Sequence, residues 1–209
     1  MKLLTLLFLV FNVVHSAEYE GLLMPAEQVT LSVLSSGVAT RLPFKMGSAV
    51  NKGDVLIALD PAKDSLNLVL AERELERSGI EKSGEVEKEI ALQLKKIAYK
   101  EKFVTAPFTG TVVNVMAKNH EYYSAGAKVI EIADLSSLVT EIHITSDELT
   151  RLKKSSDLVV FKGEEKVHAT LDSYNPIAEP GLEIFLIKIR FKNRHQWAPG
   201  TSVKVKFKS

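Results

Sequence analysis

The chain has 209 residues, 45% of them hydrophobic, which is enough for one large or two small domains with real cores. Its 27 basic and 26 acidic residues nearly cancel, which argues against a nucleic-acid-binding protein, because such a protein carries a basic stripe or a net positive domain. The chain has no cysteine, so disulfides and a lipidated N-terminal cysteine are excluded.

Residues 1–16 have the parts of a secretory signal peptide. A basic residue precedes an apolar run over residues 3–14, and Val14 and Ser16 suit a cleavage site before Ala17. The alternative is an uncleaved membrane anchor. A run of about 12 residues at ~1.5 Å each spans only about 18 Å, which is short of the ~30 Å hydrocarbon layer. We therefore expect cleavage and an exported mature chain.

An internal repeat dominates the region that follows. Gly37 and Gly53 recur with the same spacing as Gly110 and Gly126. Each copy alternates β-branched and polar residues, which predicts short strands joined by tight turns where the glycines adopt positive φ. One copy is too small to bury its own apolar face, so the two must pack together. The predicted sandwich core consists of Leu42, Val50, Leu56, Leu59, Val115, Tyr123, Val129 and Ile132.

A segment with helical periodicity, residues 62–102, separates the two copies. Pro61 suits the start of a helix, and serine–glycine pairs over residues 78–84 predict a bend between two arms. The alternative is one continuous solvated helix, but a rod would carry the two copies apart. We predict a helical hairpin. In the first arm one apolar stripe consists of Leu66, Val69 and Leu70, with Leu68, Ala71 and Leu75 beside it, and in the second arm Val86, Ile90, Leu94 and Ile97 recur at spacings of three or four.

The last part of the chain, residues 135–209, has strand character. A short helix or turn is predicted over residues 147–154. The strands that follow have proline and glycine between them, and their spacing predicts a small antiparallel barrel. A lead-in strand is predicted over residues 28–34, and residues 17–27 are a candidate contribution to the barrel. The later strands are expected near 157–162, 166–173, 182–192 and 201–208.

Four strings in this order resemble the periplasmic adaptor proteins (membrane fusion proteins, HlyD-like) of tripartite efflux and secretion systems. They are GDVLIALDP, VTAPFTGTVVNV, IADLSSLVTEIHITSDELTRLK, and the closing IKIRFKN with APGTSVKVKF. The resemblance covers about residues 28–208. It implies a mainly β fold with an α-helical hairpin. A lipoyl-like (biotinyl-lipoyl) sandwich, residues 28–61 and 103–134, is split by a coiled-coil hairpin and followed by a small antiparallel β-barrel.

The resemblance also implies a function. An adaptor of this family couples an inner-membrane transporter of the RND or ABC type to an outer-membrane channel, and it self-associates into a ring in the complex. Such a protein is not an enzyme and lies in the periplasm, held at the inner membrane by its transporter. It has no nucleic-acid partner.

The family has a signature at the hairpin tip, where an arginine and a leucine precede an aliphatic–serine pair. In this chain Arg73 and Ile80 fit the signature, Leu75 is displaced by one place, and Glu81 stands where serine is expected. By resemblance, the partner-binding tip consists of Arg73, Leu75, Arg77, Ile80, Glu81 and Ser83.

The sequence does not predict a catalytic or cofactor site. Lys45 superficially resembles a biotinylation site, but the turn that carries the modified lysine in true carriers is occupied here by the hairpin. The histidines lack metal-ligand spacing, and the repeat places Met46 and Met116 as strand residues in the core or at its rim. No cofactor or metal is expected. The competing hypothesis is a small exported ligand- or metal-binding module that uses the barrel face, but such a module needs no projecting hairpin.

Overall fold

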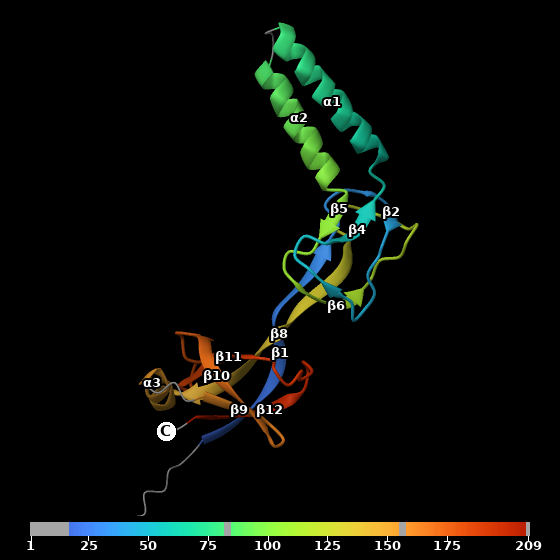
Figure 1. The fold of residues 1–209 in the computed structure, drawn as a ribbon. Coiled ribbons are helices and arrows are strands. Elements are labelled where there is room, and N and C mark those ends of the chain that lie inside the picture. The colour runs from blue at the N-terminus through green and yellow to red at the C-terminus, as the bar shows by residue number, and fades with distance from the viewer. Residues whose placement is uncertain (1–16, 82–84, 155–157, 208–209) are drawn as a thin grey trace, which may run out of the picture. The chain divides into compact units, whose positions relative to one another are not determined.

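The structure is a computed structural model that describes residues 17–81, 85–154 and 158–207 (Figure 1). Contacts divide the chain into two compact units, one from Glu27 to Leu135 and the other from the residues up to Ala26 together with Ser136–Ser209. Strands β1 (Ala17–Ser32) and β8 (Lys128–Thr145) contribute residues to both units. The predicted fold class is confirmed: the chain is mainly β, with a helical hairpin inserted in the first set of strands and an antiparallel barrel after it.

In the Glu27–Leu135 unit, each strand of one repeat copy pairs with a strand of the other. Gly37 lies opposite Tyr123, and the equivalent pair in the repeat is Val50 opposite Gly110. The two copies are therefore interlocked, because equivalent strand pairs join the first copy to the second at two places. The pairs are β2 (Gly37–Arg41) with β7 (Tyr122–Tyr123), β3 (Ala49–Val50) with β6 (Gly110–Val115), and β4 (Val55–Leu59) with β5 (Phe103–Thr105).

The core between the two copies contains the predicted residues. Val50, Leu56, Leu59, Val129 and Ile132 are buried, and the other predicted core residues pack against this cluster half-buried. The prediction for the methionines is wrong in part, because Met46 is 71% exposed and cannot be core. Met46 lies beside Gly47, in the turn before β3, where its side chain leaves the sandwich.

The repeated glycines serve two different purposes. Gly53 and Gly126 adopt φ of 92° and 86°, as predicted for tight turns. The prediction is wrong for Gly37 and Gly110, which begin strands without positive φ. A Cβ on Gly110 would lie 2.6 Å from the carbonyl oxygen of Ala133, so this glycine is required by close backbone approach.

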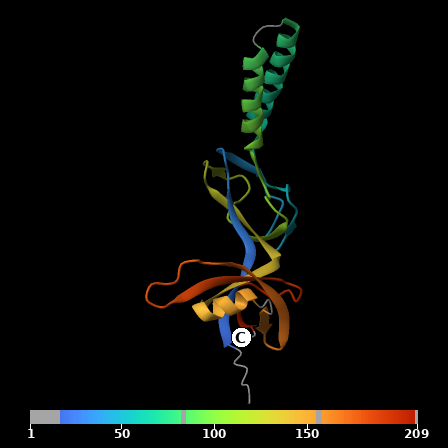
Figure 2. The same cartoon turned by 90° about the vertical axis from the view of Figure 1, so that its left-hand side faces the viewer.

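The inserted hairpin consists of α1 (Ala62–Glu81) and α2 (Glu85–Lys100), which lie side by side in both views (Figures 1 and 2). As predicted, Pro61 starts the first helix: the N–H of Ser65 donates to its carbonyl, and the Asp60 carboxylate caps the N–H of Ala62 at 3.0 Å. The helix continues through Gly79 to Glu81, beyond the start of the predicted bend.

Strands β1, β12, β9, β10, β11 and β8 pair antiparallel in that order, and β1 also pairs with β8, so the barrel closes. The lead-in strand starts at Ala17, well before the predicted residue 28, because Ala17–Leu22 pair with β12. The core of the barrel contains Leu138, Ile144, Ile187 and Val205, among other apolar residues. The remaining barrel strands are β9 (Leu158–Lys162), β10 (Glu165–Tyr174), β11 (Ile184–Lys192) and β12 (Ser202–Phe207).

The short helix α3 (Ser146–Lys154) starts with a reciprocal capping box. The Glu148 carboxylate accepts hydrogen bonds from the N–H and hydroxyl of Thr145, both at 2.8 Å, while the N–H of Glu148 donates to the Thr145 hydroxyl at 3.4 Å. Leu149 and Leu152 then pack into the barrel core. Glu148 thus caps the start of the segment predicted as a helix or turn over residues 147–154.

Candidate partner-binding surface

The base of the hairpin is closed by residues that flank it. The N–H of Leu59 donates to the carbonyl of Lys102 at 2.8 Å, so the chain leaves and re-enters the β sandwich at adjacent positions. The Lys102 ammonium donates to the carbonyl of Ser36 at 2.8 Å and lies 3.5 Å from the Asp64 carboxylate. The hairpin is therefore an insertion that the sandwich accommodates without separating its strands.

The seam between α1 and α2 is narrow. Ala71 and Leu92 are its two buried residues among those that the structure describes, at 8% and 6% exposure. Leu68, Leu75 and Tyr99 are half-buried beside them. Small and medium side chains at helical spacing let the two helices approach closely. The seam uses only part of the apolar surface that the helices carry.

The rest of that apolar surface is exposed as a stripe along each helix. We call the first stripe the α1 stripe and the second the α2 stripe. Their side chains are 42–67% exposed, whereas apolar side chains on a soluble helix usually face the core. The α1 stripe consists of Leu66, Val69 and Leu70, and the α2 stripe consists of Val86, Ile90, Leu94 and Ile97.

The two stripes point away from the seam. At about 100° per residue, Leu66 lies about 140–180° around α1 from Ala71 and Leu75, and Leu70 lies about 100–140° from them. On α2, Ile90 and Leu94 are likewise on the far side from Leu92, and the measured exposures agree. Each helix thus has two apolar faces, one covered by its neighbour in the hairpin and one uncovered.

The predicted tip residues divide among these faces. Arg73 and Arg77 are exposed and continue the α1 stripe toward the tip, because they follow Leu66 and Leu70 at helical spacing. Leu75 is half-buried and lies on the seam side. Ile80 and Glu81 are in α1, but their side chains lie outside the described residues, as does all of Ser83. Only Arg73 and Arg77 can therefore be placed together on an outer face.

Helical spacing groups the apolar residues of each arm but does not tell which of them the neighbouring helix covers. The sequence nevertheless contains a signal of uncovered positions, which is the number of apolar residues in each arm. Two helices that face each other need one apolar stripe each, whereas the first arm carries two, with Leu66 and Leu70 on one side and Leu68 and Ala71 on the other. A surplus of this kind indicates a further neighbour.

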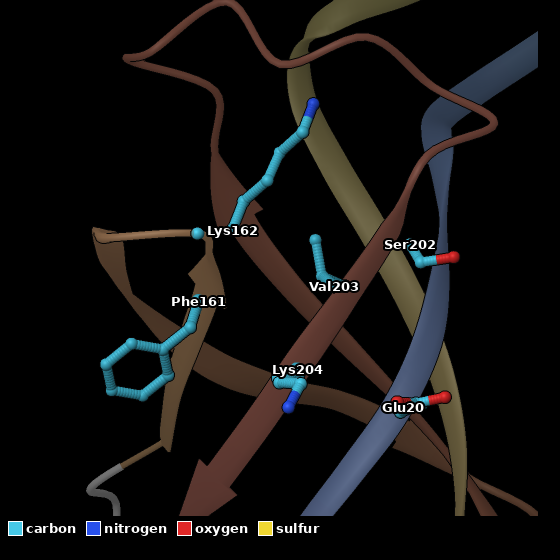
Figure 3. Close-up of a pocket in the computed structure, with 7 residues that line it drawn as sticks. Glu20, Phe161, Lys162, Ser202, Val203 and Lys204 are labelled. Carbon is cyan, nitrogen blue, oxygen red and sulfur yellow. The ribbon is translucent and has the colours of Figure 1, made fainter.

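The barrel face, which the competing hypothesis uses, has a hollow of about 340 Å³. It lies where β1, β9 and β12 meet, and Figure 3 shows Glu20, Phe161 and Lys204 around it. Lys204 is already paired with Glu18 at 2.6 Å, which raises the lysine pKa through their hydrogen bond. No group of three potential metal-ligating residues occurs in the described part of the chain. Of the charged residues that line the hollow, Lys204 is therefore already paired within the protein.

None of the helices within residues 17–81, 85–154 and 158–207 is long and apolar enough to cross a membrane.

Comparison with solved structures places the fold. The chain is similar to a MacA–MexA chimera that contains the Pseudomonas aeruginosa MexA α-hairpin domain, with 19% identity, a TM-score of 0.75, and coverage of 94% of this chain and 81% of that one. It is also similar to the membrane fusion protein Spr0693 of Streptococcus pneumoniae (14% identity, TM-score 0.72, coverage 93% and 100%). A third similar structure is that of the periplasmic adaptor protein EmrA, with 11% identity, a TM-score of 0.51, and coverage of 94% of this chain and 99% of that one. The chain therefore has the fold of the periplasmic adaptors.

Comparison at the sequence level adds little. No known family profile matches the chain. An uncharacterized protein of Haemophilus influenzae is 23% identical over 153 residues, which cover 63% of this chain. The chain matches only 40% of the length of that relative.

Proposed function

We propose that this protein is a non-enzymatic periplasmic adaptor that couples an inner-membrane transporter, of the RND or ABC type, to an outer-membrane channel. The proposal places it in the periplasm, held at the inner membrane through its transporter and assembled as a ring. Its support comes from the adaptor fold, from the N-terminal signal pattern, and above all from the two uncovered apolar stripes on the hairpin.

The stripes favour a ring because they are different surfaces on opposite sides of one hairpin. Contact between the α1 stripe of one copy and the α2 stripe of the next is heterologous, and such contacts close into rings when the rotation allows. An isologous dimer would instead leave one stripe of each copy uncovered. The apolar side chains are each about half exposed, so covering one contributes roughly 1 kcal/mol.

The heights of the two stripes also match. Because α1 and α2 run antiparallel, residues at equal sequence distance from the hairpin base stand at the same height. Leu66 is then level with Ile97, and Leu70 with Leu94. Nearer the tip, Arg73 and Arg77 stand level with Ile90 and Val86, so their aliphatic stems can pack on these residues while the guanidinium groups stay in water.

We infer that the tip positions Arg73 and Arg77, with Ile80, Glu81 and Ser83 beyond them, form the part that meets the channel. The tip departs from the family signature at Leu75 and Glu81, so we expect the apolar stripes to contribute more to assembly than the signature does. Arginine suits such a contact because its guanidinium can pair with carboxylates while its stem packs.

Cysteine cross-linking tests the ring contact directly, since the chain has no cysteine of its own. One copy carries Leu70→Cys and a second, differently tagged copy carries Leu94→Cys. Co-expressed in the periplasm of the native host, the two should form a mixed disulfide. The matched control pair is Glu74→Cys with Glu89→Cys, which stand at the same height but away from the stripes. Equal cross-linking of both pairs, or none at 70–94, contradicts the proposed contact.

The coupling itself is tested by isolating the complex. A tagged adaptor solubilised from membranes should co-purify with both an inner-membrane transporter and an outer-membrane channel. The Leu70→Asp variant should no longer co-purify with the channel. Recovery of the adaptor with neither partner, under conditions where the 70–94 cross-link forms, would contradict the adaptor function while leaving the self-contact intact.

A further inference from the structure

A groove on the barrel is lined almost entirely by basic side chains. It has a volume of about 420 Å³ and lies where β10 starts and β11 ends. Small-molecule sites are typically 300–1,000 Å³, so this groove lies at the small end of that range. Its lining consists of Lys166, Val167, His168, Lys192, Arg194 and His195.

Strand pairing brings these basic groups together. β10 and β11 are antiparallel, with Thr170 opposite Arg190. Two residues further along each strand, the same register brings His168 beside Lys192, and both side chains are exposed. An imidazole and an ammonium group, both of which can donate hydrogen bonds, therefore stand at the rim of the same groove.

Further along the same two strands, the basic side chains of β11 form ion pairs with acidic ones. Arg190 donates to the Asp172 carboxylate from Nε at 2.7 Å and from a terminal nitrogen at 3.3 Å. This hydrogen bond holds the pKa of Asp172 below its ordinary value. Lys188 pairs with Glu141 at 3.0 Å. One end of the strand pair is thus electrically balanced within the protein.

At the groove end the balance is absent. Within the described part of the chain, Lys166, Lys192 and Arg194 make no ion pair. The carboxylate of Glu165 contacts the groove residue His195 and is also held by Trp197. It accepts a hydrogen bond from the indole N–H of Trp197 at 2.5 Å, and its other oxygen lies 3.5 Å from Nδ1 of His195.

We propose that this groove binds a phosphate-type anion, either a soluble phosphate or the headgroup of an anionic phospholipid. Arginine matches the oxygens of such an anion with paired N–H donors, and lysine supplies a compact point charge. His168 and His195 add N–H donors at the same rim. The groove is separate from the hairpin, so this inference does not depend on the ring contact.

Trp197 provides a local reporter of binding. It is the only tryptophan of the chain, and its ring stacks on that of His195 with centroids 5.6 Å apart. An anion held by Arg194 and His195 should change this environment. Titration of the mature chain with inorganic phosphate, at constant ionic strength set with chloride, should give a saturable change in tryptophan fluorescence.

The double variant Lys192→Gln/Arg194→Gln should weaken phosphate affinity at least tenfold. The matched control, Lys204→Gln/Lys206→Gln, removes the same charge from cations of β12 that pair with Glu18, and it should leave the affinity unchanged. Vesicles of phosphatidylglycerol and of phosphatidylcholine separate the two sources of phosphate. Response to soluble phosphate supports a soluble ligand, and response to phosphatidylglycerol vesicles alone supports the lipid headgroup.

Two results would overturn the proposal. One is the absence of a saturable change with both phosphate and phosphatidylglycerol vesicles. The other is an equal loss of affinity in the Lys204/Lys206 control, which would show that net charge rather than the groove attracts the anion. Circular dichroism of both double variants confirms that each is folded before the comparison.

Discussion

Lys102 forms an ion pair with Asp64 at 3.5 Å, although the hairpin lies between them in the sequence. Lys102 also donates to the carbonyl of Ser36 in the β sandwich at 2.8 Å. One side chain therefore joins the start of α1, the end of α2 and the sandwich. The two ends of the insertion lie together, and removing the insertion should leave the strands on either side of it in place.

Replacing residues 64–100 with an Asn-Gly turn should give a folded β core. The core residues of the sandwich lie outside the hairpin, and loop-closure entropy changes by only about 0.6 kcal/mol per doubling of loop length. We expect a thermal midpoint of the sandwich within a few degrees of the parent and a loss of helical circular dichroism. Cross-linking and transport should both fail. An unfolded deletion variant would instead show that the hairpin is structural.

Leu92 and Leu94 separate folding from assembly on one helix. Leu92 is 6% exposed in the seam, so Leu92→Ala should destabilise the hairpin by about 2–3 kcal/mol. Leu94 is 62% exposed on the α2 stripe, so Leu94→Ala should change stability by less than about 0.5 kcal/mol. Association in the complex should respond mainly to Leu94. Thermal melts followed by circular dichroism, beside cross-linking at other stripe positions, measure both effects. A larger stability loss for Leu94→Ala would contradict the assignment of the seam.

Gly110 and Gly37 are equivalent in the repeat, but their surroundings differ. A Cβ on Gly110 would lie 2.6 Å from the carbonyl oxygen of Ala133, whereas on Gly37 it would lie 3.3 Å from Cβ of Leu59. Backbone yields less than a side chain does, so we expect Gly110→Ala to cost about 1–3 kcal/mol and Gly37→Ala to cost less. Denaturant unfolding of the two variants gives the comparison, and equal losses would refute it.

The barrel should lose stability in acid. Burial alone would raise the pKa of Glu148, but hydrogen bonds from Tyr19 and Thr145 outweigh it, so the pKa lies below its ordinary value. The pKa of Asp172 is lowered mainly by its hydrogen bond to Arg190. Such groups stabilise the fold above their unfolded pKa, about 4, and this contribution is lost as pH falls through the folded pKa.

The measurement is the thermal midpoint of the barrel, read from Trp197 fluorescence, as pH falls from neutral to about 3. Glu148→Gln should lower the midpoint at neutral pH and flatten its acid dependence, because the amide still accepts a hydrogen bond but carries no charge to lose. An unchanged acid slope in this variant would show that the capping carboxylate does not control the transition.

The sequence by itself determined the order of the parts. The repeat of Gly37 and Gly53 as Gly110 and Gly126 predicted two halves that pack on each other, and Pro61 marked the start of the inserted helix. These features are local or periodic. Backbone sterics and hydrophobic spacing determine them whatever the tertiary contacts of the segment are. Core residues such as Leu56 and Ile132 could be predicted for the same reason, and both are buried in the sandwich core.

Only the tertiary structure decided which faces are covered and where charges meet. Leu92 and Leu94 have the same side chain two positions apart, yet the position of α1 buries one and leaves the other exposed. His168 and Lys192 are distant in the sequence, yet both line one groove because β10 and β11 pair antiparallel. Burial and electrostatic balance depend on which segments come together in space, and the register of a strand pair is settled only when one face of the sheet is buried and the turn between the strands is formed.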